Sequence, residues 1–127
     1  MPKNFRDTKQ RTAILSALQE AQHPLTPKQL RDRASQIAPG LGIATVYRNI
    51  RLLLDNEEIE SLDIPGHGAC YMLPQNGQRA IVVCRKSKSI HLADPASIKI
   101  NHKHLPENFN AEQVSVFIYG HFNGTSK

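Results

Sequence analysis

Small residues and arginines share one face of a predicted helix that runs from Ile43 to about Asn56. With about 100° of rotation per residue, the apolar residues fall on one arc: Ile43, Val46, Ile50, Leu53 and Leu54. The opposite arc carries Ala44, Thr45, Arg48 and Arg51, and Tyr47 lies on the border. Guanidinium groups bind phosphate or guanine through paired hydrogen bonds, and small side chains permit close approach to base edges. This face is therefore a candidate nucleic-acid-binding surface; the alternative is an ordinary solvated face.

The basic residues of the first half of the chain are grouped, and the acidic ones are displaced from them. Near the start lie Lys3, Arg6, Lys9 and Arg11, and a second group contains Lys28, Arg31, Arg33, Arg48 and Arg51. The acidic residues come later: Asp55, Glu57, Glu58, Glu60 and Asp63. The net charge of +5 is compatible with a polyanionic partner but is common among proteins that bind none. It is the grouping that favours nucleic acid, with Arg6, Lys9 and Arg11 as a basic arm.

The elements around this helix predict a winged helix-turn-helix. An earlier helix is expected over Thr8–Ala21, and a second begins at the capping sequence Thr26-Pro27-Lys28-Gln29 and runs to about Ile37. After the third helix, segments 59–64 and 69–73 are predicted to be two short strands, joined in a hairpin by the turn Pro65-Gly66-His67-Gly68. In such a fold the last helix enters the major groove of DNA.

The polar stretch 74–78 is the one plausible domain boundary. Residues 1–75 would form the winged-helix DNA-binding domain, and residues 78–127 a reduced α/β dimerisation domain, so the fold class is α+β. Strands are expected in the second part over Ala80–Cys84, Ile90–Leu92, Ile98–Ile100 and Val114–Tyr119. With so few large apolar residues, this part is expected to complete its core by pairing with a second copy, which makes the protein a homodimer.

The segment Gly42-Ile43-Ala44-Thr45-Val46-Tyr47-Arg48-Asn49-Ile50 resembles the DNA-binding half of the ferric uptake regulator family. Segments 8–15, 23–26 and 118–121 extend the resemblance over most of the chain. The resemblance implies that Tyr47 and Arg48 lie on the recognition helix and that Arg6 reaches the minor groove. It also implies a dimer that binds double-stranded DNA at an inverted repeat.

The metal ligands of that family are mostly missing here. Its members usually carry a histidine-rich stretch before a CxxC pair, which supplies imidazoles and thiolates to iron, manganese or zinc. In this chain segment 78–84 has no histidine, and the remaining positions hold Ser87, Met72 and Val114. Only His23 matches a ligand position, and one imidazole does not assemble a site. No metal cofactor is expected, with weak binding of zinc, iron or manganese left open.

A relocated metal site is the alternative. His102 and His104 would share one face of an extended strand, with His91 and His121 nearby and His23 as a further candidate. The simpler interpretation is that these are exposed histidines, because no carboxylate or cysteine at a helpful spacing completes the set.

The expected function is a sequence-specific, metal-independent transcriptional regulator. The alternative is a protein-interaction module that pairs with an intact family member and modulates it. No nucleophile elbow, phosphate-binding glycine loop or acid pair predicts an enzyme, and Cys70 and Cys84 are expected to be small buried residues. No apolar run approaches the length of a membrane helix, so a cytoplasmic protein without membrane contact is expected.

Overall fold

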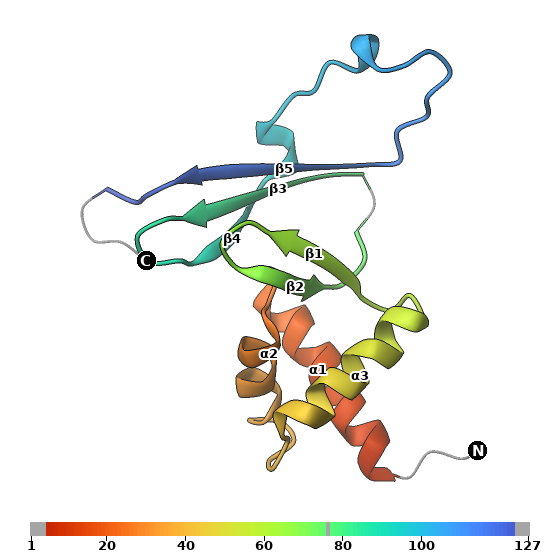
Figure 1. Ribbon diagram of the computed structural model, residues 1–127, viewed down its shortest axis with the longest axis vertical. Coiled ribbons are helices and arrows are strands. Elements are labelled where there is room, and N and C mark those ends of the chain that lie inside the picture. Colours follow the sequence, from red (N-terminus) through yellow and green to blue (C-terminus); the bar gives the residue numbers. More distant parts are fainter. Residues whose placement is uncertain (1–4, 76, 124–127) are drawn as a thin grey trace. The chain divides into compact units, whose positions relative to one another are not determined.

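The computed structural model describes residues 5–75 and 77–123, with side chains from residue 8 onward. The chain divides into two compact units, Met1–Pro74 and Gln75–Lys127 (Figure 1), and each is described by itself. Among the described residues no helix is long and apolar enough to cross a membrane.

The first unit consists of three helices followed by a two-stranded hairpin. Helices α1 (Phe5–Ala21), α2 (Pro27–Ala34) and α3 (Ile43–Asp55) precede strands β1 (Glu60–Ile64) and β2 (Gly68–Met72), which pair antiparallel. The predicted cap of α2 is present: the Gln29 amide donates to Thr26 Oγ1 at 3.2 Å, and Gln29 Oε1 accepts from the Thr26 amide at 3.0 Å. These elements form the predicted winged helix-turn-helix, within the expected α+β class.

Side chains from all three helices and the hairpin close one core in this unit. Its fully buried members include Ala13 and Ile14 of α1, Leu30 of α2, and Val46 and Leu53 of α3. The apolar arc predicted for α3 therefore faces inward, apart from the exception below.

Helix α2 is shorter than predicted, and α3 departs from the predicted apolar arc at its first residue and buries one polar residue. Helix α2 ends at Ala34, and the turn that follows leaves Ile37 42% exposed while Ala38 enters the core. Ile43, at the first position of α3, is 38% exposed. Asn49 is buried instead, because its side-chain Nδ2 donates to the Thr45 carbonyl at 2.9 Å and satisfies the amide inside the helix turn.

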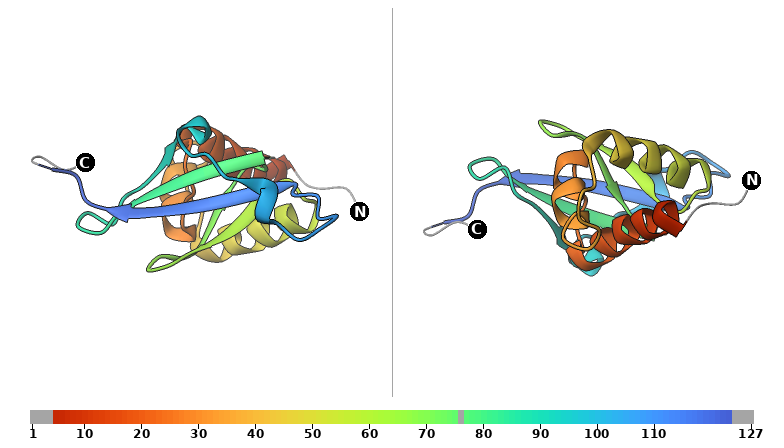
Figure 2. Two further views of the ribbon diagram at one scale, coloured as in Figure 1. Left: turned by 90° about the horizontal axis from the view of Figure 1, so that it is seen from above. Right: turned by 90° about the horizontal axis from the view of Figure 1, so that it is seen from below.

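The second unit is built on a three-stranded sheet of order β4-β3-β5. Strand β3 (Gly77–Cys84) pairs antiparallel with β4 (Ile90–Ala93) and parallel with β5 (Gln113–Gly120). Figure 2 shows the parallel course of β3 and β5 from two further directions. Strand β3 is largely buried, whereas no residue of β5 is buried.

The strand predicted over Ile98–Ile100 is wrong. After β4 the chain forms two short 3-10 helices, Pro95–Ser97 and His102–His104, and residues 98–100 connect them. The side chain of Gln78 on β3 donates to the carbonyls of Pro95 and Ile98, at 3.0 and 2.6 Å. These bonds hold the segment against β3 without extending the sheet.

Candidate nucleic-acid interface

Helix α3 is fixed by one buried face and presents the other. Val46, Ile50 and Leu53 are at most 3% exposed, so rotation of the helix about its axis would remove apolar surface from the core. Gly42 is its N-cap, and the preceding Gly40 has a φ of +85°, a conformation in which a side chain is strained. The turn and the buried stripe together determine which residues reach the surface.

The predicted contact residues of α3 lie on that surface. Ala44, Arg48 and Arg51 are exposed and Tyr47 is 54% exposed, while Thr45 is half-buried. Among the described side chains neither arginine forms an ion pair, since the salt bridge there joins Arg31 to Asp32. Both guanidinium groups are therefore available to an external anion.

The predicted basic arm belongs to α1. Lys9 is exposed, whereas Arg11 is half-buried and its Nε is inaccessible to solvent. Arg6 falls within α1, but its side chain lies outside the described part. Lys9 is thus the member of the arm that the structure presents most openly.

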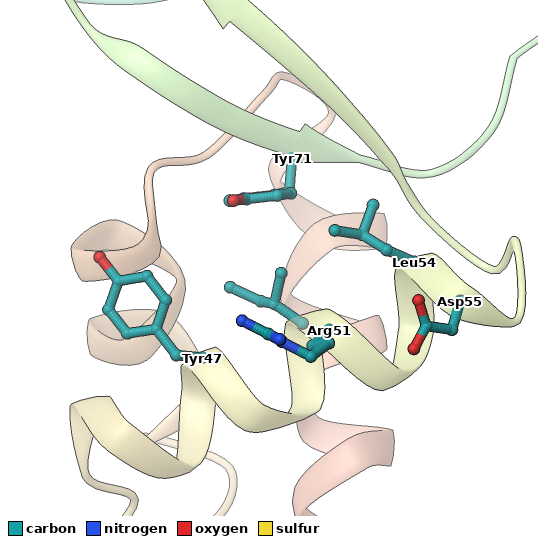
Figure 3. A pocket seen from close by; sticks show the side chains of 6 residues that line it. Tyr47, Arg51, Leu54, Asp55 and Tyr71 are labelled. Atoms are coloured by element: carbon teal, nitrogen blue, oxygen red, sulfur yellow. The ribbon is translucent and has the colours of Figure 1, made fainter.

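A pocket between α3 and β2 was missed by the sequence analysis. It encloses about 440 Å³ and is lined by Tyr47, Ile50, Arg51, Leu54, Asp55 and Tyr71 (Figure 3). Tyr71 comes from β2, where two backbone hydrogen bonds of 2.8 and 2.9 Å join it to Leu25. The pocket exists because the hairpin folds back onto α3, and no local pattern around Tyr71 announces that contact.

The Tyr71 side chain is only 8% exposed. Burial raises the pKa of its hydroxyl above the ordinary value, and the nearby Tyr47 and Cys70 raise it further. Tyr71 therefore keeps its proton at neutral pH and serves as a hydrogen-bond donor.

The histidines of the alternative metal site are not brought together. His102 and His104 are exposed and belong to a 3-10 helix. The prediction that they share one face of an extended strand is therefore wrong. His91 Nε2 lies 2.8 Å from Ser89 Oγ, and His23 Nδ1 donates to the Pro24 carbonyl at 3.0 Å. His121 is exposed as well. Among the described residues, no group of three or more histidine, cysteine, aspartate or glutamate side chains could hold a metal ion.

The positions that the family resemblance assigns to metal ligands carry other chemistry. Arg79 is 1% exposed, and its guanidinium donates to the Gln75 carbonyl at 2.9 Å. Cys84 Sγ accepts from the Ser87 amide at 3.5 Å. Hydrogen bonds from the side chain and the backbone of Ser87, with smaller contributions from the backbones of Phe122 and Lys86, lower the pKa of the thiol to about 7. A buried cation and a lone thiol do not make a divalent-metal site, so the residues present do not fit the metals of the family.

Both cysteines are buried, as predicted, and neither forms a disulfide within the described part of the chain. Burial, with a smaller contribution from Asp63, raises the pKa of Cys70 to about 11. The two thiols therefore titrate on opposite sides of the ordinary value.

Comparisons with known proteins agree with this geometry. The model of the ferric uptake regulator family matches residues 2–119. The ferric uptake regulation proteins of Campylobacter upsaliensis and Campylobacter jejuni are 34% identical over 80 residues and 33% identical over 91. These alignments cover 61% and 69% of this chain but 51% and 58% of the relatives, so the chain spans about half the length of the curated relatives it matches.

Solved structures share the fold over nearly the whole chain. The Francisella tularensis ferric uptake regulator with iron has a TM-score of 0.67 at 25% identity and covers 97% of both chains. The Campylobacter jejuni peroxide stress regulator has a TM-score of 0.68 at 22% identity, covering 94% of this chain and 91% of its own. By the extent of the family match, this chain belongs to the ferric uptake regulator family.

Proposed function

We propose that the protein acts in the cytoplasm as a homodimeric, sequence-specific DNA-binding transcriptional regulator that does not require a metal ion. The observation that carries this proposal is the exposed face of α3, where Arg48 and Arg51 form no ion pair with any described side chain and lie beside the small residue Ala44. Family membership supports the same activity.

Each part of the first unit has a role in this proposal. Helix α3 lies in the major groove, where Arg48 reads a base edge and Ala44 and Thr45 permit close approach. Tyr47 and Arg51 contact the groove edge. Arg6, Lys9 and Arg11 of α1 bind the backbone or reach the minor groove, as family resemblance implies.

The second unit supplies the dimer. Strand β5 carries apolar residues on both faces, and its alternating residues are half-buried or exposed. Ile118 is 37% exposed, and such a strand is stabilised when a second subunit covers it. Two-fold symmetry of the dimer would match an inverted repeat in the DNA.

Metal independence is supported by the ligand positions. The Francisella tularensis regulator was solved with iron and a related manganese uptake regulator with zinc. In this chain the positions that the family resemblance assigns to metal ligands hold residues such as Arg79, Met72 and Ser87, which are not usual ligands for these ions. A metal ion shifts a conformational equilibrium only if it binds one conformation more tightly than the other. Such binding needs converging ligands, and none converge among the described residues.

Selection of bound fragments from random duplex DNA tests the proposal. The purified full chain should enrich one inverted repeat, and the Arg48→Ala variant should lose preference at one position of each half-site. Lys86→Ala, which changes an exposed cation of the second unit, serves as the matched control. Failure of the wild-type chain to enrich any sequence would overturn the proposal, and would turn attention to the protein-interaction alternative.

A further inference from the structure

We propose that the pocket formed by Tyr47, Arg51 and Tyr71 binds one backbone phosphate of duplex DNA at the edge of the major groove. This inference rests on the proposed function and assigns a role to a residue, Tyr71, that lies outside the recognition helix. It also gives the two arginines of α3 different roles: Arg48 contacts a base, and Arg51 contacts the DNA backbone.

The donors in the pocket suit a phosphodiester. Figure 3 shows the polar ends of Tyr47, Arg51 and Tyr71 turned to the same side of the pocket. A guanidinium offers charge-assisted hydrogen bonds to phosphate oxygens, and tyrosine hydroxyls are common donors to the same atoms. Three donors around one opening are more than a single base edge accepts.

Tyr71 is held in place before any ligand arrives. Its backbone amide and carbonyl bond to Leu25, the residue is 8% exposed, and no hydrogen-bond partner of its hydroxyl is found among the described residues. The hydroxyl lines the pocket, where it can donate to an acceptor that binds there. Because the side chain is already ordered, little conformational entropy is lost on binding.

Charge places the phosphate at the Tyr47 end of the pocket. Asp55 lies one helical turn beyond Arg51, and its carboxylate would repel an anion. In Figure 3 the Arg51 guanidinium extends away from Asp55 and toward Tyr47, and the two charges form no ion pair. The guanidinium is therefore not neutralised within the described part of the chain, and its charge is directed to the end that the two tyrosines line.

The position fits a backbone contact. The pocket begins at Tyr47, one turn after Ala44, and extends along α3 to Asp55 and across to Tyr71 of the hairpin. A helix seated in the major groove has the phosphate backbone along its flanks. A residue at this flank contacts phosphate whatever the base sequence, so it fixes register without carrying sequence information.

Two conservative variants test the inference in the full-length protein. Tyr71→Phe removes one hydroxyl and keeps the buried ring, and Arg51→Gln removes an exposed charge. We expect Tyr71→Phe to weaken binding three- to tenfold on the selected operator and on unrelated duplexes alike. Arg51→Gln should weaken both as well and lower the slope of log affinity against log salt by about one. Lys86→Gln, which removes an exposed charge of the second unit outside β5, is the matched control and should bind like wild type.

Operators with a single neutral methylphosphonate locate the phosphate. One position in each half-site should weaken the wild-type protein, and Arg51→Gln and Tyr71→Phe should be insensitive to that same substitution. Wild-type affinity in both variants, with Arg48→Ala still impaired, would overturn the phosphate pocket and leave the proposed function standing. Absence of any duplex binding by the wild-type chain would overturn both.

Discussion

The two units of this chain differ in how completely they bury their apolar residues. In the first, Leu30, Val46 and Leu53 have no exposed surface and the helices close a core by themselves. In the second, β3 is buried but every residue of β5 remains half-buried or exposed. The helical unit therefore buries a core of its own, whereas the sheet unit leaves the apolar residues of β5 partly exposed.

The units also differ in what they keep of the family pattern. The first keeps the segment around Tyr47 and Arg48 that carries the resemblance, although Met72 stands there at one ligand position, and the second holds Arg79 and Ser87 at others. Under the proposed function, DNA reading is kept while the metal switch is lost.

The largest effect is expected in the core of the first unit. Leu53→Ala should lower the free energy of unfolding by about 2 to 5 kcal/mol, because it removes a fully buried side chain and leaves a cavity. The neighbouring Leu52 is 42% exposed, so Leu52→Ala should cost no more than about 0.5 kcal/mol. Urea unfolding of both variants measures the two costs, and equal costs would refute the described orientation of α3.

The second expected effect concerns dimerisation. Ile118→Glu should weaken the dimer about thirtyfold, or about 2 kcal/mol, because it places a charge on a face that a partner covers. Leu52→Glu, a similarly exposed apolar residue of the first unit, is the control and should leave the dimer intact. Sedimentation at micromolar concentration measures both. A wild-type monomer with a folded second unit would show that β5 needs no partner.

A smaller loss is expected at Arg48. Arg48→Ala should weaken operator binding by roughly 1 to 3 kcal/mol and relax one position of the site, since a base contact carries sequence information. The chain should unfold as wild type does, because this side chain is exposed. Anisotropy titrations with operators changed one base at a time give the measurement, and a uniform loss on every sequence would assign Arg48 to phosphate.

The smallest effect is a pH dependence of stability from the thiols. The pKa of Cys84 is lowered to about 7, so between about pH 7 and 9 the unfolded chain binds more protons and stability rises with pH. The pKa of Cys70 is raised to about 11, so above about pH 9 its contribution reverses and stability falls. Urea midpoints of wild type and Cys84→Ser at pH 7 and 9 test this, because the variant should lose the rise. The same rise in Cys84→Ser would assign the effect elsewhere.

Much of the first unit was predictable because its signals are local. The cap at Thr26 and the apolar arc of α3 each depend on residues within a few turns of one another. The burial of Asn49 was not predicted. A side-chain amide is stable inside a core only when it has a hydrogen-bond partner, and a pattern of apolar residues does not show that the Thr45 carbonyl is that partner.

The errors and omissions lie where distant segments meet. Tyr71 enters the pocket because β2 pairs with Leu25 and lies against α3, which no spacing within β2 reveals. Residues 98–100 alternate like a strand, yet the side chain of Gln78 binds the Ile98 carbonyl and the segment stays outside the sheet. For residues 98–100 a long-range hydrogen bond overrides local propensity, whereas β2 forms as predicted and only its partner lies beyond local sequence.

Metal independence is tested most directly by measuring the affinity of the protein for the selected operator in the presence and absence of metal. Anisotropy titrations of the full chain should give the same dissociation constant, within twofold, in chelator and in Mn²⁺, Fe²⁺ or Zn²⁺, and the purified protein should hold less than one equivalent of metal per subunit. One tightly held equivalent per subunit, together with a loss of tenfold or more on chelation, about 1.4 kcal/mol, would contradict metal independence.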